Sequence, residues 1–308
     1  MFGPSVSPPL DFLQSVQSDN GHWYQTLQKL GSGRNATTFL VMATGHSDAN
    51  RGLLFALKMF HRVDCPAKED EFIAEARFLC DCHHPAIMAV VDQGVFDGTH
   101  PFFVAEYLPN TLRDVIPRHP PVLEKLCYTI QLLSALVYLD RRPDQIVHRD
   151  IKPENIFLKG RSCVLGDFGL MLRLTADANT ALNEPQMPKK YRTPDLVAFE
   201  RDAIRPTTKS DVFQLGLVIA ELFTGRNPLK ESADKLAPIG LHELVPDEQL
   251  PVAIRESAPR LVAKMLLEDP ADRPSAVELI DEWRDVFLYA ARLMNVLEGK
   301  VFLSSLLT

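Results

Sequence analysis

The texture of the sequence changes at Pro109, and this change constrains the fold more than any other feature. Before it, short runs rich in β-branched and aromatic residues predict strands at 37–44, 53–60 and 102–108, with one amphipathic helix over about 68–82. After it, apolar residues at three- and four-residue spacing predict long helices, one of which covers 209–224 and ends at Gly225. A strand-rich part followed by a helix-rich part predicts an α+β chain with two lobes.

The same pattern places the domain boundaries. Residues 1–20 carry Pro4, Pro8 and Pro9 together with several serines, and we interpret them as a tail outside the fold. The remaining chain is divided into a small β-rich lobe, a hinge, a larger helical lobe and a C-terminal helical extension, at 21–107, 108–111, 112–290 and 291–308.

Composition excludes several classes of protein. The chain has 308 residues, of which 46% are hydrophobic and 24% charged, so it can bury a core and is neither disordered nor collagen-like. A net charge of −7 argues against a nucleic-acid partner. Five cysteines, an odd number, favour reduced thiols over a disulfide framework. No apolar run of about 18–20 residues and no secretory signal is apparent, so we expect a cytoplasmic protein without a membrane partner.

A glycine-rich run lies between two predicted strands. Gly31-Ser32-Gly33-Arg34-Asn35-Ala36 has the G-x-G-x-x-A spacing, which lets backbone N–H groups face phosphate oxygens. A Rossmann turn accepts the same letters, but there the loop opens a helix, whereas the residues after Ala36 favour a strand. Taken alone, the run fits an ordinary glycine-rich hairpin equally well.

Three further motifs occur in a fixed order. Ala56-Leu57-Lys58 lies on the strand after the glycine run, His148-Arg149-Asp150-Ile151-Lys152-Pro153-Glu154-Asn155 lies in the helix-rich part, and Asp167-Phe168-Gly169 follows. Together they resemble the eukaryotic-type protein kinases, and the HRDIKPEN run is similar to their serine/threonine branch. The resemblance covers about residues 24–288.

The resemblance implies a reaction and its cofactors. The γ-phosphate of ATP would pass to a serine or threonine hydroxyl of a protein, the chain itself included, with Mg²⁺ neutralising charge. Asp150 would orient the hydroxyl and accept its proton, and Lys152 would bind the γ-phosphate. Lys58 would hold the α- and β-phosphates and pair with a helix carboxylate, for which Glu75 is preferred and Glu71 is the alternative. Asn155 and Asp167 would be the metal ligands.

The nucleotide-binding residues follow from the same resemblance. Ala105 occupies the gatekeeper position, and its small size predicts space behind the adenine, unless it is simply a buried strand residue without ligand access. The residues implied to contact ATP come from the glycine run, the next two strands, the hinge and the larger lobe: Leu30, Gly31, Ser32, Gly33, Ala36, Thr38, Ala56, Lys58, Ala105, Glu106, Leu108 and Phe157.

Two later stretches resemble structural parts of the family. Asp211, in Ser210-Asp211-Val212-Phe213-Gln214-Leu215-Gly216, aligns with the residue that holds the catalytic-loop backbone. Thr193-Pro194-Asp195 replaces the usual Ala-Pro-Glu, so the pair between Asp195 and Arg273 is expected to be strained or bridged by water. Pro188 stands where the family has a threonine, and this leaves the shape of the peptide-docking loop open.

Regulation and alternative functions complete the expectations. Thr175 and Thr180 are candidate phosphorylation sites, with Arg149 as the partner of a phosphate. Lys189, Lys190 and Arg192 form a basic cluster that either selects acidic substrates or is simply solvated. A metal site at Cys80, Cys82, His83 and His84 is a weak alternative, because no second ligand pair has zinc-type spacing. The competing functions are a pseudokinase scaffold and a kinase acting on a small molecule.

Overall fold

The computed structural model describes residues 10–45, 49–61, 65–174, 189–195, 206–230, 235–236 and 252–298. The chain divides into two compact units, Met1–Pro109 and Asn110–Thr308. The boundary lies inside the predicted hinge. The first unit contains the large sheet and the second contains most of the helices together with short strands, as the change of texture at Pro109 predicted.

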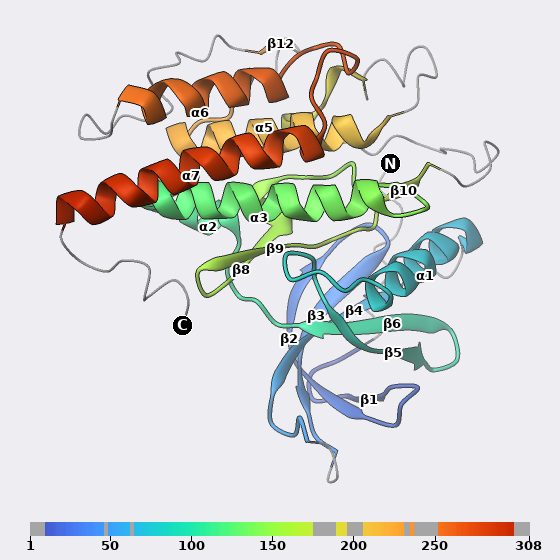
Figure 1. Cartoon of the computed structure of the whole chain (residues 1–308). Helices are drawn as coiled ribbons and strands as arrows, with labels where there is room; N and C mark the ends of the chain where they lie inside the picture. Colours follow the sequence, from blue (N-terminus) through green and yellow to red (C-terminus); the bar gives the residue numbers. More distant parts are fainter. Residues whose placement is uncertain are drawn as a thin grey trace. The chain divides into compact units, whose positions relative to one another are not determined.

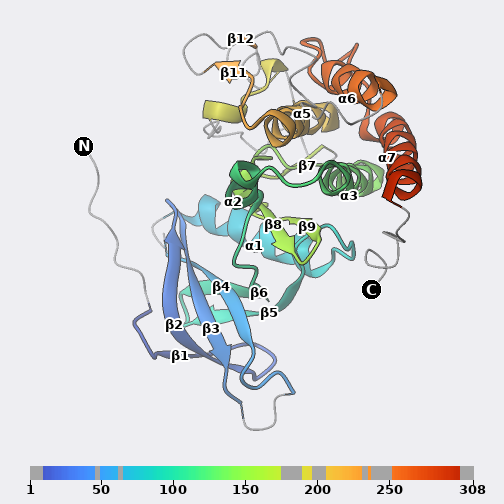
Figure 2. The same ribbon diagram turned by 90° about the vertical axis from the view of Figure 1, so that its left-hand side faces the viewer.

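The first unit is a six-stranded antiparallel sheet with one helix (Figures 1 and 2). The strand order is β1-β2-β3-β4-β6-β5. The elements are β1 (Ser15–Gln17), β2 (Trp23–Ser32), β3 (Ala36–Ala43), β4 (Leu54–Phe60), α1 (Pro66–Cys80), β5 (Val90–Phe96) and β6 (His100–Glu106). Helix α1 begins two residues earlier than predicted, because a proline is tolerated in the first turn of a helix.

The two faces of this sheet have different roles. One face carries the apolar core, in which Tyr24, Val41 and Leu57 are almost completely buried. The opposite face packs against α1, whose Phe72 contacts Phe60 and Phe103 at ring-centroid distances of 5.6 and 5.4 Å. Side chains alternate between the faces, so the strands that build the core also present a second row of residues on the helix side.

The predicted N-terminal tail is wrong from about residue 10 onward. Strand β1 pairs with β2 in antiparallel register, with Val16 opposite Tyr24, and Leu10 and Val16 are buried in the core. Because the first ten residues are rich in proline and serine, the sequence predicted a tail and missed the short strand that follows them. The sheet therefore begins before residue 21, and β1 forms one of its edges.

The second unit is built around three long helices. Helices α3 (Val122–Arg141) and α5 (Thr208–Thr224) contact each other, and α7 (Ala276–Glu298) packs along α3 (Figure 1). The remaining elements are α2 (Leu112–Val115), β7 (Ile146–Val147), β8 (Ile156–Lys159), β9 (Ser162–Leu165), β10 (Leu172–Arg173), β11 (Leu229–Lys230), β12 (Lys235–Leu236), α6 (Val252–Met265) and 3₁₀ turns at Ile116–Arg118, Pro153–Asn155 and Lys189–Tyr191.

Helix α5 is the buried centre of this unit. Every residue from Ser210 to Phe223 is buried. The helix begins at a capping box between Thr207 and Ser210 and ends, as predicted, at Gly225, whose φ of 75° suits glycine. Gly216 lets α6 approach closely, because a Cβ there would lie 2.9 Å from the Met265 Cβ.

Two features of the helices differ from expectation. Helix α7 continues through residue 290 without a break, so the predicted extension at 291–308 begins inside it. Among the described residues, α3 is long and apolar enough to cross a membrane by length and composition. More than half of α3 is buried, however, and it packs against α5, α7 and β9 as a core helix.

Candidate active site

The first unit holds an ion pair between β4 and α1. The Lys58 Nζ lies 2.9 and 3.0 Å from the two carboxylate oxygens of Glu75, which is buried. The alternative partner, Glu71, instead pairs with Lys68 one turn earlier on the same helix, at 2.9 Å. The preferred assignment of Glu75 is therefore confirmed. Because both Glu75 oxygens contact the ammonium, the pair fixes Lys58 on the helix side of the sheet.

The glycine run forms a strand–turn–strand hairpin, which excludes a Rossmann turn, because a Rossmann turn opens a helix. The Gly33 N–H donates to the Ala36 carbonyl at 2.8 Å, and β2 and β3 pair on either side. Neither Gly31 nor Gly33 has a positive φ, so the backbone itself does not demand glycine here. A Cβ on Gly31 would meet no described atom within 4 Å. The open space at this turn is what close approach of a phosphate requires.

The predicted adenine-binding residues of the first unit occupy neighbouring strands. Thr38 pairs with Lys58 across β3 and β4, and Ala56 pairs with Ala105 across β4 and β6. Ala105 is 6% exposed. Leu30 and Ala36 lie on β2 and β3, Glu106 is the last residue of β6, and Leu108 follows it. Phe157 lies on β8 of the second unit, half-buried and bridged to Thr111.

The second unit positions Asp150 with one oxygen engaged and one unpaired. The Asp150 Oδ2 accepts hydrogen bonds from Lys152 Nζ at 2.7 Å and Asn155 Nδ2 at 2.9 Å. The Oδ1 atom is buried and accepts no hydrogen bond from the described residues. Burial raises the pKa of this carboxyl group, and the Lys152 ammonium opposes the shift. A carboxylate with a raised pKa and an unpaired oxygen is suited to accept a proton.

Helix α5 holds the backbone of this loop. The two carboxylate oxygens of Asp211 accept the N–H groups of His148 and Arg149 at 2.7 and 2.9 Å, as the resemblance implied. Burial raises the pKa of Asp211 to about 7, against the effect of these donors. Gln214, which the sequence analysis missed, accepts the Ile151 N–H and donates to the Arg149 carbonyl, both at 2.9 Å. Its only sequence signal is that it is the one polar residue in the apolar stretch 212–220.

The two predicted metal ligands lie at the ends of one hairpin. Asn155 precedes β8 and Asp167 follows β9, and the Gly166 N–H donates to the Asn155 carbonyl at 2.9 Å. The Asn155 side-chain nitrogen is directed at Asp150. Asp167 is exposed and has a φ of 58°, an unfavourable backbone conformation of the kind that concentrates at functional sites. Amide and carboxylate oxygens in this arrangement fit Mg²⁺, which needs few protein ligands when phosphates supply the rest.

A buried ion pair closes the segment after the basic cluster. The Arg273 Nη2 lies 3.1 Å from the Asp195 Oδ1, and both side chains are almost fully buried. Ser210 also donates to Asp195, and the Arg273 guanidinium stacks 4.8 Å from the Phe213 ring centroid. The expectation of a bridging water is therefore wrong, since the shorter aspartate reaches the arginine directly.

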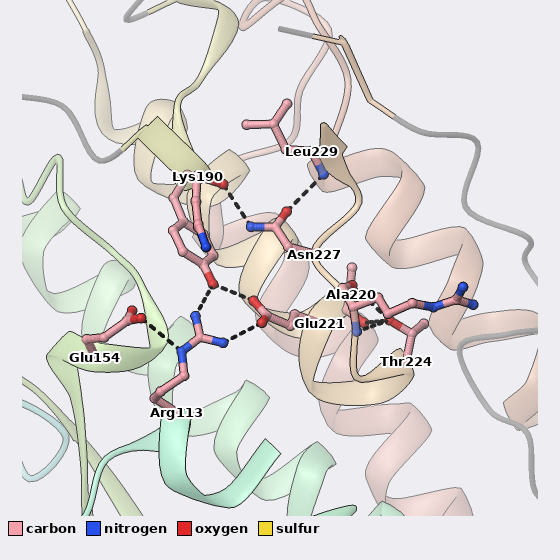
Figure 3. A network of polar contacts seen from close by, with 10 residues as sticks. Arg113, Glu154, Lys190, Ala220, Glu221, Thr224, Asn227 and Leu229 are labelled. Atoms are coloured by element: carbon pink, nitrogen blue, oxygen red, sulfur yellow. Dashed lines mark hydrogen bonds and ion pairs between the residues drawn. The ribbon is translucent and has the colours of Figure 1, made fainter. Parts of the chain in front are cut away.

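A second network, which sequence reasoning missed, centres on Arg113 (Figure 3). Its guanidinium donates to Glu154 at 2.8 Å, to Glu221 at 2.5 Å and to the Tyr191 hydroxyl at 2.6 Å. The Tyr191 hydroxyl in turn donates to Glu221. Burial alone would lower the pKa of Arg113, but the hydrogen bonds to Glu154 and Glu221 raise it. The network ties α2 to the catalytic loop, α5 and the turn at Lys189–Tyr191.

Some predicted residues have other outcomes. Thr175, Thr180 and Pro188 lie outside the described residues, so what the sequence predicts for them stays a prediction. Arg149 donates from its side chain to the Leu170 carbonyl. None of the five cysteines forms a disulfide, and within the described part of the chain no group of three or more potential ligands from His, Cys, Asp and Glu could hold a metal.

The sequence was compared with known proteins. The family model of the protein kinase domain matches residues 24–283. The chain is 31% identical over 265 residues to the serine/threonine-protein kinase PrkC of Bacillus subtilis, which is 83% of this chain and 39% of that protein. It is 32% identical over 276 residues to the serine/threonine-protein kinase PknL of Mycobacterium tuberculosis, which is 85% of this chain and 64% of that protein.

These matches agree with the geometry of both units. The ion pair on β4 and α1, the loop around Asp150 and the hairpin that ends in Asp167 all lie within the matched residues. The match covers most of this chain, although the chain spans only 39% and 64% of the length of the two relatives. The chain belongs to the family of proteins with a protein kinase domain.

Proposed function

We propose that the chain is an ATP-dependent protein kinase that phosphorylates serine and threonine hydroxyls of proteins. The observation that carries the proposal is the environment of Asp150, with Oδ2 held by Lys152 and Asn155, and with Oδ1 buried and accepting no hydrogen bond from any described residue. The named activity of the relatives supports the choice of serine and threonine over other acceptors.

In this reaction Asp150 orients the acceptor hydroxyl with its unpaired oxygen. The hydroxyl oxygen forms a bond to the γ-phosphorus, the bond between this phosphorus and the ADP oxygen breaks, and the hydroxyl proton passes to Asp150. Lys152 places a cation beside the transferred group, and Lys58, held by Glu75, binds the α- and β-phosphates. Mg²⁺ bound by Asn155 and Asp167 would neutralise phosphate charge.

The pseudokinase alternative has no specific observation in its favour. Lys58 and Glu75 form their pair, and Asp150, Asn155 and Asp167 are all present in a formed loop and hairpin. For the location of the chain, we propose the cytoplasm, where ATP is abundant and where five cysteines without a disulfide are compatible with a reducing environment.

Transfer of labelled phosphate from ATP to a generic acceptor protein tests the proposal. Asp150→Asn keeps the size of the side chain but removes the acceptor of the proton, so we expect transfer to fall by about 10²- to 10⁴-fold. Nucleotide binding should persist in this variant. Acid hydrolysis of the wild-type product should give phosphoserine and phosphothreonine. Transfer that survives Asp150→Asn, or a wild type that binds nucleotide without transferring phosphate, would contradict the proposal.

A further inference from the structure

A chain of side-chain hydrogen bonds ties the glycine turn to the end of β4. His61 follows β4 directly and is 6% exposed. Its Nδ1 lies 3.0 Å from the Thr37 Oγ1, which lies 2.9 Å from the Ser32 Oγ. On the other side of the ring, Nε2 lies 3.2 Å from the Arg34 carbonyl oxygen. The His61 backbone N–H adds a bond of 3.0 Å to the Asn35 carbonyl.

The chemistry of these groups fixes the direction of each bond. A carbonyl oxygen only accepts, so the His61 Nε2 carries the proton and donates to Arg34. Burial lowers the pKa of His61, the hydrogen bond to the Arg34 carbonyl opposes this, and the positive charge of Lys29 on β2 lowers the pKa further, so the net shift is downward and the ring is neutral near pH 7. The Nδ1 atom therefore accepts from the Thr37 hydroxyl, whose oxygen accepts from Ser32.

The position of this chain of bonds matters for phosphate binding. Ser32 lies between Gly31 and Gly33, whose turn leaves the open space described above. Lys58 lies on β4 three residues before His61 and is held by Glu75. The bonds thus connect the glycine turn to the end of the strand that carries Lys58, and two of the three side chains, Thr37 and His61, lie outside the motifs that carry the family resemblance.

We propose that Thr37 and His61 are positioning residues that clasp the glycine turn in the geometry required by the nucleotide phosphates. The inference rests on the proposed function, because it assigns the turn to ATP. A glycine-rich turn has many accessible conformations, and ordering it at the moment of binding costs free energy. A turn that is already held before the nucleotide arrives avoids this cost, so the clasp should increase nucleotide affinity without touching the nucleotide.

Thr37→Val tests the clasp because valine keeps the shape of threonine and removes only the hydroxyl. We expect the dissociation constant for Mg²⁺-ADP, measured by calorimetry, to rise about threefold to tenfold, which corresponds to the loss of one hydrogen bond. The KM for ATP should rise by a similar factor, whereas the KM for the protein acceptor should not change. Thr37→Ser keeps the hydroxyl and should restore both values.

Hydrogen exchange provides a readout that does not depend on activity. In the nucleotide-free full chain, amides of residues 31–37 should exchange about threefold to tenfold faster in Thr37→Val, while amides of β5 and β6 keep their rates. His61→Phe should give the same effect, and the double variant should add less than twofold, since both substitutions break one chain of bonds. His100→Gln removes a histidine of the same unit whose ring bonds Thr99, and it should leave the turn unchanged.

The outcomes separate the clasp from the proposed function. Three results would each overturn the clasp. The amides of Thr37→Val could exchange at the wild-type rate, the KM for the protein acceptor could rise as much as the KM for ATP, or the effects of Thr37→Val and His61→Phe could be additive. Failure of the wild type to bind Mg²⁺-ADP would overturn the proposed function, and the exchange rates would still show whether the turn is clasped. Melting temperatures within a few degrees of wild type confirm that the variants are folded; an unfolded Thr37→Val would leave Thr37→Ser and His61→Phe to decide.

Discussion

His148 shows how one buried side chain fixes the catalytic loop at the scale of a residue. Its Nδ1 accepts the Asp150 N–H at 3.2 Å, and its Nε2 donates to the Gly166 carbonyl at 3.1 Å. The ring packs edge-on against Phe168 at a centroid distance of 4.4 Å. One donor and one acceptor on the ring require the neutral imidazole, so the loop around Asp150 and the hairpin before Asp167 depend on the protonation state of His148.

We predict that stability falls at acidic pH through His148. Burial lowers the pKa of His148 to about 4, whereas an unfolded histidine has the ordinary value of 6.5. The contribution of neutral His148 to the free energy of unfolding is therefore fully present above pH 6.5 and is lost as the pH falls towards 4, by at most about 3 kcal/mol.

His148→Gln does not titrate, so the wild-type midpoint in urea should fall between pH 7.5 and 4.5 by more than the midpoint of the variant. His119→Gln is the control, because His119 is exposed. Parallel pH dependences of wild type and His148→Gln would refute the assignment.

Ala105 leads to a prediction about inhibitor size. Ala105 lies opposite Ala56 across β6 and β4, so two methyl groups are adjacent at this point of the sheet. If ligands reach this position, purine analogues with a bulky N6 or C3 substituent should inhibit the wild type, and Ala105→Met should weaken the inhibition by at least tenfold with the KM for ATP changed much less. Inhibition curves for both proteins are the measurement. Equal inhibition would mean that Ala105 is a buried strand residue without ligand access.

The sequence predicted single residues where the resemblance supplied a role for them. Lys58, Glu75 and Asp211 make the contacts that the motifs implied. Arg113 and His61 escaped prediction, because each is a lone polar residue with no local pattern. Two partners of Arg113, Tyr191 in the 3₁₀ turn and Glu221 on α5, are 78 and 108 residues away in the sequence, and such pairings depend on tertiary packing.

At the scale of elements, periodicity predicted the helices well and missed β5. The predicted helix at 209–224 differs from α5 by one residue. Strand β5 has the reverse of the usual pattern, because Val91 and Val95 are exposed while Asp92 and Gly94 are buried. Asp92 tolerates burial because it accepts hydrogen bonds from Asn20, His22 and Tyr24 at 2.8–3.0 Å. A strand whose buried face is polar cannot be recognised from alternating hydrophobicity.

The Arg113 network predicts an effect on the protein substrate. Arg113→Ala removes three hydrogen bonds and leaves Glu221, whose side chain is 8% exposed, without its guanidinium partner. We expect a loss of about 2 kcal/mol in the free energy of unfolding, measured in urea. Because Tyr191 lies two residues before Thr193, in the segment that resembles the docking loop, the KM for the protein acceptor should rise at least threefold, with the KM for ATP unchanged.

Two further variants make this test specific. Arg113→Lys can donate to only one or two of the partners, because an ammonium lacks the planar fork of a guanidinium. The KM for the protein acceptor should therefore stay close to that of Arg113→Ala. Arg118→Ala, on an exposed arginine in the neighbouring 3₁₀ turn, should leave stability and both KM values unchanged. A rise in the KM for ATP as large as the rise for the acceptor would mean that the network does not act on the docking segment.

At the scale of the whole molecule, the sequence predicted the division into a β-rich and a helical unit but not the full extent of either. The change at Pro109 is local, so composition and periodicity reveal it. The addition of β1 to the sheet depends on pairing with β2, and the continuity of α7 depends on packing against α3 and α6. Contacts of this kind are made between elements and leave little trace in a short window of sequence.

Binding of Mg²⁺-ATP should stabilise the folded chain, and the stabilisation should depend on Lys58 and on Asp167. A ligand at a hundred times its dissociation constant adds about 2.7 kcal/mol to stability, which corresponds to roughly 4 °C in melting temperature for a chain of this size. Asp167→Asn should abolish the part of this shift that EDTA removes, because it withdraws a carboxylate ligand from the metal. Lys58→Met should reduce the shift with or without the metal.

Lys68→Met is the control for this prediction. It removes an ammonium that pairs with Glu71 on the same unit, so its shift in melting temperature should equal that of the wild type. A full shift in Asp167→Asn in the presence of Mg²⁺, or an unchanged shift in Lys58→Met, would show that the nucleotide does not depend on these groups, and the assignment of both residues to the active site would then be wrong.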